Sequence, residues 1–412
     1  MESKDRQHGR APFGVISRRD LLKGAAATLA VASAAPASAK PAGTILAYVG
    51  TYTPNGQGIH RFNVDPSTGS LTQQKIFPST INPSWLAFHP SNTYLYAADE
   101  ISNFNGTTNG AVTAYAVLSN GDLIALNTVS SGGSGPAHVS VHPTGKWVLV
   151  ANYGGGNVAV LPINPDGSLG NATDIRVDVT ACSPVCLVGP THAAEAPPGS
   201  FAISGHDAPH AHMIQSDPAG NFVLVNDLGL DLTIIWSFDG VNGKLLSPRT
   251  VPSSAGAGPR HFAFHPNGLW FYSLNEEAST LAFMTYDATT GSLSPVQEIS
   301  TLPDAFVGTN FTSEVMVSQD GRFVYAANRL HDSIAVFAVD GTGLLTRVGE
   351  EWTRGDYPRN FNIEPTGKFL YACNHRGDSI TTFRIDAGGG KLKFTDHYTA
   401  VGSPAVIVFL TL

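Results

Sequence analysis

The sequence predicts an all-β fold, a seven-bladed β-propeller that is closed by pairing of N- and C-terminal strands in one blade. The main observation is a repeated hairpin phrase, in which an alternating strand, a tight turn and a second apolar strand follow one another. One such hairpin cannot bury its own apolar face, so its repetition predicts blades or a solenoid. The turn residue of the six copies is Pro90, Pro143, Pro218, Pro266, Gln319 and Pro365.

A second phrase, a glycine shortly before a leucine, gives an independent count of the blades. We expect each copy to close a hairpin between two outer strands, where glycine supplies the positive φ that such turns need. Its seven copies contain Gly69, Gly121, Gly167, Gly243, Gly291, Gly343 and Gly390.

The seventh inner hairpin is split between the two ends of the chain. Residues 403–409 resemble its first strand, and residues 44–52 resemble its second. Pairing of these segments would close the ring and remove the exposed sheet edges. No long stretch has a 3.6-residue apolar period, so we expect few helices.

The first 39 residues have the pattern of a twin-arginine signal peptide. Arg18 and Arg19 precede an Ala-rich apolar run, and residues 37–39 form a small-residue cleavage site. The run is too short and too Ala-rich for a lasting membrane span. We therefore expect residues 1–39 to be removed, residues 40–412 to form one propeller domain, and the protein to be periplasmic or secreted.

The charge of the remaining chain excludes several partners. Without residues 1–39, it carries 18 basic and 29 acidic residues. This acidic balance argues against nucleic acid and against an anionic membrane surface as partners. A closed ring has no obligatory need of a second chain, so we expect a monomer.

One long excursion, at about residues 170–209, interrupts the spacing of the repeats and is expected to be a loop over one face. It contains Cys182 and Cys186, which an exported protein could join in a disulfide if the loop bends suitably. Cys373 lies in a repeat strand and has the character of a small core residue.

Candidate site residues are found where the repeat departs from itself. Six residues before each turn residue and ten residues after it, the chain lies at the same end of the hairpin, so these positions should surround one mouth of the central channel. The earlier position holds Ser84, Ala137, His212, Arg260, Ser313 and Arg359. The later position holds Glu100, Tyr153, Leu228, Glu276, Arg329 and His375.

These residues have the chemistry of a site for a small anion. Arginine forks bind carboxylate or phosphate, and His and Glu move protons near neutral pH. Polar residues that only hydrate the channel are the alternative, but the combination of His212, Arg260, Glu276 and Arg329 favours a site.

The other histidines have less specific predicted roles. His89, His142 and His265 precede the turn prolines and are expected to be structural. His206, Asp207, His210 and His212 could bind a metal, but no zinc-type spacing accompanies them, so neither a metal nor a cofactor is predicted. There is no Gly-x-Ser-x-Gly elbow, which argues against a serine hydrolase.

The repeated phrases resemble the lactonase family of seven-bladed propellers, which includes bacterial 6-phosphogluconolactonases and carboxymuconate cyclases. The resemblance covers nearly the whole mature chain and is most marked at five stretches. These are residues 48–52, 151–155, 209–213, 258–262 with 274–276, and 327–329. The sequence departs from the pattern at Met316, where relatives often have His.

This resemblance implies an active site of one His, two Arg and one Glu, which fall on His212, Arg260, Arg329 and Glu276. It also implies hydrolysis, or reversible closure, of a small carboxylated or sugar-derived lactone. We expect His212 and Glu276 to be catalytic, in roles of base and acid that the sequence does not assign. Substrate binding is expected from Arg260, Arg329, His210, Arg359 and Glu314. A carboxymuconate-type cycloisomerase and a non-catalytic binding propeller are the alternatives.

Overall fold

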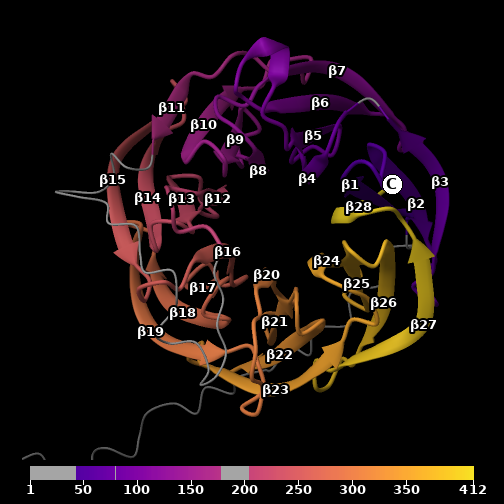
Figure 1. The fold of residues 1–412 in the computed structure, drawn as a ribbon. Coiled ribbons are helices and arrows are strands. Elements are labelled where there is room, and N and C mark those ends of the chain that lie inside the picture. The colour runs from indigo at the N-terminus through magenta and orange to yellow at the C-terminus, as the bar shows by residue number, and fades with distance from the viewer. Residues whose placement is uncertain (1–42, 79, 178–203) are drawn as a thin grey trace, which may run out of the picture. The chain divides into compact units, whose positions relative to one another are not determined.

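The computed structural model describes residues 43–78, 80–177 and 204–412, and residues 43–412 form one compact unit. Seven four-stranded antiparallel sheets are arranged in a ring around a central axis (Figure 1). The only helix in the described ranges is a short 3-10 turn at Phe104–Gly106. The predicted all-β, seven-bladed fold is confirmed. None of the described helices is long and apolar enough to cross a membrane.

Six blades are each made of four consecutive strands. We number the blades in chain order and name the strands of each blade from the channel outwards. Blade 1 contains β4 (Pro83–Phe88), β5 (Tyr94–Asp99), β6 (Ala111–Val117) and β7 (Leu123–Ser130). Blade 2 contains β8 (Pro136–Val141), β9 (Trp147–Asn152), β10 (Asn157–Pro162) and β11 (Asp174–Val177). Blade 3 contains β12 (Ala211–Ser216), β13 (Phe222–Asp227), β14 (Leu232–Asp239) and β15 (Lys244–Pro252).

Blade 4 contains β16 (Pro259–Phe264), β17 (Trp270–Asn275), β18 (Thr280–Asp287) and β19 (Ser292–Ser300). Blade 5 contains β20 (Thr312–Val317), β21 (Phe323–Asn328), β22 (Ser333–Val339) and β23 (Leu345–Trp352). Blade 6 contains β24 (Pro358–Ile363), β25 (Phe369–Asn374), β26 (Ser379–Ile385) and β27 (Leu392–Ala400).

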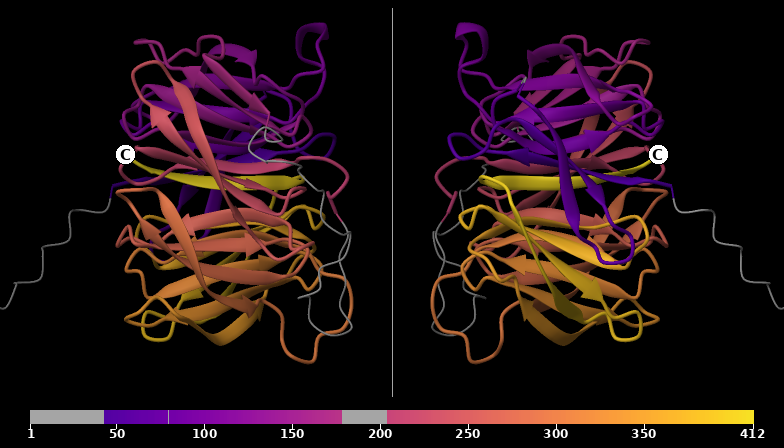
Figure 2. Two further views of the ribbon diagram at one scale, coloured as in Figure 1. Left: turned by 90° about the vertical axis from the view of Figure 1, so that its left-hand side faces the viewer. Right: turned by 90° about the vertical axis from the view of Figure 1, so that its right-hand side faces the viewer.

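The closing blade joins both ends of the chain, as predicted. Its order is β28 (Pro404–Thr411), β1 (Ile45–Thr51), β2 (Ile59–Val64) and β3 (Leu71–Phe77). β28 pairs with β1 along its length, from Thr411 opposite Ile45 to Pro404 opposite Thr51. The side views show the strands running between the two faces of the ring, with the C-terminus at one of them (Figure 2).

The prediction that about residues 170–209 form a long loop is wrong in part. Asp174–Val177 forms β11, which pairs with β10 and supplies the outer strand of blade 2. Asp174 is buried and its carboxylate accepts a hydrogen bond from the backbone N–H of Leu245 in blade 3, so neighbouring contacts hold this short strand. Cys182 and Cys186 lie outside the described residues, as does the predicted signal peptide.

The core is distributed between the blades. Seven large buried apolar clusters each combine side chains of two neighbouring blades. Cys373 belongs to the cluster between blade 6 and the closing blade and is fully buried, which confirms its predicted core position. Each blade therefore depends on both neighbours for burial of its two faces.

Two repeated hydrogen bonds link neighbouring blades on the turn side. The imidazole Nε2 atoms of His89, His142 and His265 lie 3.0, 2.9 and 2.9 Å from glycine carbonyl oxygens in the next blade, so these histidines are structural, as predicted. Tyr48 donates to the carbonyl oxygen of Gly121, which has a φ of +80°. A Cβ there would approach Leu46 to 2.1 Å, so this turn requires glycine.

A β-bulge near the start of the innermost strand occurs in all seven blades. The ladder between the first and second strands shifts register there, so that two residues of the first strand lie opposite one of the second. Such bulges re-aim side chains next to functional sites. The extra residue, or in blade 5 the first of the two unpaired residues, is Ser84, Ala137, His212, Arg260, Ser313, Arg359 and Ala405.

Candidate active site

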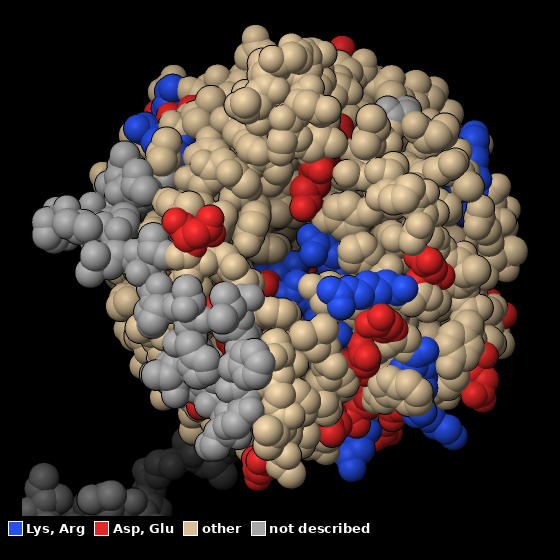
Figure 3. Space-filling model, in the orientation of Figure 1, with Lys and Arg blue, Asp and Glu red and all other residues tan. Residues whose placement is uncertain are grey.

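The bulged residues and the residues that follow each second strand lie at the same mouth of the channel. The residues that follow the second strands are held by a repeated backbone hydrogen bond. The N–H of Glu276 donates to the carbonyl oxygen of Gly258, and the N–H of Arg329 donates to that of Phe311. The side chain that follows β1 is Tyr52, the seventh member of this ring. Seen from this side, Lys and Arg side chains gather around the central hollow, with acidic side chains beside them (Figure 3).

Glu276 is the shared acceptor at the centre of the site. Its Oε2 atom lies 2.9 Å from Nε of Arg260 and 2.6 Å from an Nη atom of Arg329. All three side chains are at least 90% buried. Burial alone would raise the pKa of the Glu276 carboxyl, but the charges of Arg329 and Arg260 outweigh it and hold this pKa below its ordinary value. Glu276 is therefore an ionised carboxylate.

The two arginines are held from several sides. Arg260 also donates to the carbonyl oxygen of Ser313, and burial together with the charge of Arg329 lowers its pKa to about 10. Arg329 donates to the hydroxyl of Tyr357 at 3.1 Å and lies over the rings of Tyr357 and Phe311. Its Nε atom is buried and has no hydrogen-bond partner among the described residues.

His212 lies beside this cluster as a neutral imidazole. Its ring is 4.9 Å from that of His261 and 5.5 Å from that of Tyr153, measured between centroids. Burial, followed by the charge of Arg260, holds the pKa of His212 well below its usual range. Its Nδ1 atom is buried and has no hydrogen-bond partner in the described part of the chain.

Arg359 and His210 occupy the rim. Arg359 donates to the hydroxyl of Tyr52 at 2.7 Å and lies 3.6 Å from a carboxylate oxygen of Glu100. His210 stacks on Tyr153 with ring centroids 4.4 Å apart. Its Nδ1 and Nε2 atoms lie 2.9 Å from the Tyr153 carbonyl and 2.9 Å from Asp207, so its hydrogen bonds are already used.

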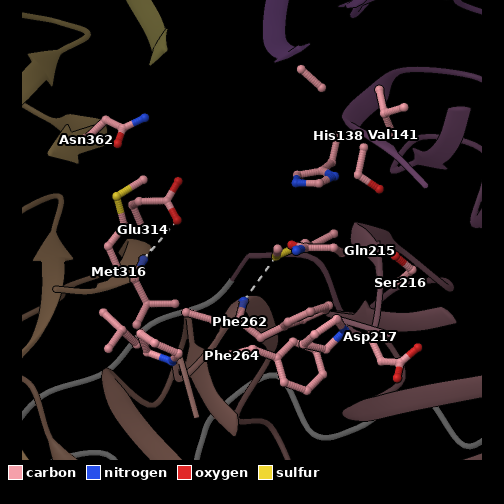
Figure 4. A pocket seen from close by; sticks show the side chains of 18 of the residues that line it. His138, Val141, Gln215, Ser216, Asp217, Phe262, Phe264, Glu314, Met316 and Asn362 are labelled. Carbon is pink, nitrogen blue, oxygen red and sulfur yellow. Dashed lines mark hydrogen bonds between the residues drawn. The ribbon is translucent and has the colours of Figure 1, made fainter. Parts of the chain in front are cut away.

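Glu314 is separated from the other predicted site residues. It lies one layer deeper, where it contacts His261 and Asn360, and it lines a cavity of about 740 Å³ on the opposite side of the channel. Figure 4 shows Glu314 and His138 facing this cavity from opposite sides, with Met316 beside Glu314. None of His212, Arg260, Glu276 and Arg329 lines it. The structure thus gives no direct support for a substrate contact from Glu314.

The histidine-rich stretch before β12 is held by ion pairs of His206. Among the described residues, no group of three or more His, Cys, Asp or Glu side chains could hold a metal ion. His206 instead lies 3.0 Å from both Asp231 and Glu277. Burial would lower the pKa of His206, but these two carboxylates raise it to about 9, so the charged imidazole anchors this segment to blades 3 and 4.

Three contributors to the mouth were not predicted from the sequence. Tyr52 was missed because its repeat is split between the chain ends, although its place after a repeat strand is visible once both halves are aligned. Tyr357 lies just before the inner strand of blade 6, outside the compared positions. His261 follows the bulge, and only the change of register brings it towards Arg260.

Residues 46–409 match the model of the family described as "Lactonase, 7-bladed beta-propeller". This chain belongs to that family. It is 36% identical over 324 residues to a Bacillus subtilis protein named 6-phosphogluconolactonase, a match that covers 78% of this chain and 85% of the relative. A Formosa agariphila 6-phosphogluconolactonase is 29% identical over 330 residues, with 77% and 86% covered.

A solved structure agrees with the fold. The Pseudomonas aeruginosa periplasmic gluconolactonase superposes with a TM-score of 0.78 at 27% identity, over 89% of this chain and 99% of that structure. The family match covers all seven blades and the four residues of the mouth, so the arginine-lined opening belongs to a lactonase-type propeller.

Proposed function

We propose that this protein hydrolyses a small lactone at the mouth formed by His212, Arg260, Glu276 and Arg329. The observation that carries the proposal is the buried Arg260–Glu276–Arg329 cluster beside the neutral imidazole of His212. Two positive charges can stabilise the oxyanion formed from an ester carbonyl, and a proton acceptor can activate the attacking water. Membership of the lactonase family supports the same reaction class.

In the proposed reaction, His212 is the base and the two arginines stabilise the developing charge. His212 accepts a proton from water as the water oxygen attacks the lactone carbonyl carbon. The carbonyl oxygen becomes an oxyanion, which Arg260 and Arg329 stabilise. When the ring C–O bond breaks, the imidazolium returns its proton to the leaving oxygen, and the new carboxylic acid releases a proton to solvent. Glu276 is already ionised, so it orients both arginines and is a poor candidate for the acid.

The substrate that fits best is a sugar-derived or carboxylated lactone. Arg359, Tyr52 and Glu100 at the rim present both donors and acceptors, which suits a molecule carrying hydroxyl groups or an anionic group. The names of the Bacillus and Pseudomonas relatives make glucono-δ-lactone and its 6-phosphate the first compounds to test.

The test is release of acid, measured by pH-stat titration with glucono-δ-lactone, its 6-phosphate and muconolactones. We expect turnover well above the spontaneous rate for at least one of them. Glu276→Gln and His212→Asn should each lower turnover by roughly a hundredfold. Activity that both variants retain would refute the site. Conversion of muconolactone to an unsaturated diacid without hydrolysis of gluconolactones would instead support the cycloisomerase alternative.

We also propose that the protein is exported through its twin-arginine signal. The motif at Arg18 and Arg19 and the periplasmic member of the family support this. Replacing both arginines with lysine should retain the protein in the cytoplasm, as measured by cell fractionation. Unchanged fractionation of this variant would contradict the proposal.

A further inference from the structure

A second layer of side chains lies beneath the mouth, one residue after the bulges. It consists mainly of aromatic and ionisable groups. The indole of Trp85 packs 4.4 Å from the ring of His138 and 5.0 Å from that of His261. Trp85, His138 and Glu314 also line the opposite cavity. His261 therefore lies between the arginines of the mouth and the groups that face the other side.

The carboxyl group of Glu314, whose pKa burial raises to about 8, has three polar neighbours. Its Oε1 atom lies 3.2 Å from Nδ1 of His261 and accepts a hydrogen bond from the backbone N–H of Val315 at 3.0 Å. Its Oε2 atom accepts a hydrogen bond from the Asn360 side-chain amide at 2.6 Å. Glu314 is 3% exposed. A buried carboxyl with this many partners has one defined orientation.

His261 connects Glu314 to Arg260. Its Nε2 atom lies 3.4 Å from an Nη atom of Arg260. A guanidinium can only donate, so Nε2 must be the acceptor, and the ring proton must then be on Nδ1, where it faces Glu314. Burial, together with the charge of Arg260, holds the pKa of His261 well below its usual range. The ring is thus a neutral imidazole in a single tautomer.

We propose that Glu314 and His261 form a positioning dyad that fixes the guanidinium of Arg260 for catalysis from beneath the active site. Glu276 holds Nε of Arg260 from the mouth side, and His261 accepts from an Nη atom on the other side. With both ends of its planar fork held, the guanidinium has one orientation towards the substrate. The catalytic part of this inference rests on the proposed lactonase function.

Substitution of Glu314 should disturb this arrangement without removing a substrate contact. In Glu314→Gln, the side-chain NH2 must face either Asn360 or His261, so two donors oppose each other. If the NH2 group faces His261, it favours the His261 tautomer that carries its proton on Nε2. That N–H would then point at the guanidinium of Arg260, which is also a donor. We expect kcat to fall by about tenfold to a hundredfold, with a smaller change in KM.

The experiment combines kinetics with a direct measurement of the His261 tautomer. Nitrogen-15 NMR of the histidine-labelled full-length protein, with His261→Asn used to assign the signal, should show protonated Nδ1 in the wild type. In Glu314→Gln, the Nε2-protonated form should become populated. The double variant Glu314→Gln/His261→Asn should be no slower than His261→Asn alone, because both changes break one chain of contacts.

His265→Asn is the matched control, because His265 directly follows the strand that holds His261 but contacts Gly321 on the turn side. It should leave kcat and KM unchanged. An Nε2-protonated His261 in the wild type, or an unchanged kcat in a folded Glu314→Gln variant, would overturn the dyad. If the wild type hydrolysed no lactone, the proposed function would fail, and the tautomer would still decide whether the dyad exists.

Discussion

The two ends of the inner strand serve different purposes, one structural and one chemical. Histidines that recur before the turn prolines bond to glycine carbonyls in the next blade. At the other end of the strand, His212, Arg260 and Arg359 differ from blade to blade and have no equivalent partner. The identity of the individual side chain therefore carries the chemistry, and the repeat only supplies its place.

A substitution of Arg260 tests this conclusion for one side chain. Arg260→Lys keeps the charge, but a single ammonium cannot reach Glu276, the Ser313 carbonyl and His261 together. We predict a loss of kcat/KM of roughly a hundredfold on the lactone that the wild type hydrolyses. Steady-state kinetics measure this loss, and thermal unfolding verifies that the variant is folded.

Arg322→Lys is the control for this prediction, since Arg322 lies on the surface and pairs with Asp320. It should retain wild-type kcat/KM. Arg260→Lys with more than half of the wild-type activity would show that the fork geometry is unimportant.

Within the strands, the bulge decides which side chains reach the channel. It removes one residue of each inner strand from the ladder, or two in blade 5. The second strand then ends in a recurrent buried polar residue, which is Asn152, Asn275, Asn328 and Asn374 in four blades. In blade 1 this position is Asp99, whose oxygens accept from Thr80 and Thr113.

The buried carboxyl of Asp99 should make the free energy of unfolding depend on pH. Burial raises the pKa of its carboxyl to about 7, so between the ordinary value of 3.8 and 7 the folded protein holds a proton that the unfolded chain has released. The wild type therefore loses stability as the pH rises through this interval. Asp99→Asn does not titrate, and we predict that it raises the free energy of unfolding by on the order of 2 kcal/mol at pH 8.

Urea unfolding at pH 4 and pH 8 measures this difference, which should nearly vanish at pH 4. Asn374 is the model for the substituted residue, because its amide donates to the equivalent hydroxyl of Thr381 at 3.0 Å. An equal difference at both pH values would contradict a raised pKa as the cause.

At the scale of the whole molecule, closure of the ring holds the site together. The mouth combines residues from blades 3, 4 and 5, and its rim includes Tyr52 of the closing blade and Arg359 of blade 6. Each inter-blade core is shared, so opening the ring at one place exposes two apolar faces. Ile407 in β28 belongs to one of these cores and is fully buried.

A chain that ends after Gly402 tests this dependence. It lacks β28, and β1 becomes an open inner edge with no partner on the channel side. We predict loss of cooperative unfolding and of lactonase activity, measured by circular dichroism with heating and by the acid-release assay.

A circular permutant is the control, because the N–H of Leu412 already donates to the carbonyl oxygen of Thr44 at 3.0 Å. Joining residues 43 and 412 through a short linker and opening the chain between Gly388 and Gly389 keeps all the strands. It should unfold cooperatively. A truncated chain that unfolds cooperatively and stays active would show that closure by β28 is dispensable.

The sequence by itself determined the number of blades, the closure of the ring and the four positions of the mouth. These follow from strand periodicity and turn residues, which are local properties repeated often enough to be counted. It did not predict β11, because a four-residue strand has too few residues to establish an alternation. Its stability comes from contacts such as that of Asp174 with Leu245.

Only the tertiary structure decided which side chains are partners. Glu276 forms ion pairs with arginines of blades 4 and 5, Glu314 lies beneath the mouth with His261, and Tyr52 completes the rim. No local pattern encodes these contacts, because they join residues that are 16 to 307 positions apart, as from Arg260 to Glu276 and from Tyr52 to Arg359. Their geometry depends on the bulge and on ring closure, which are consequences of packing between blades.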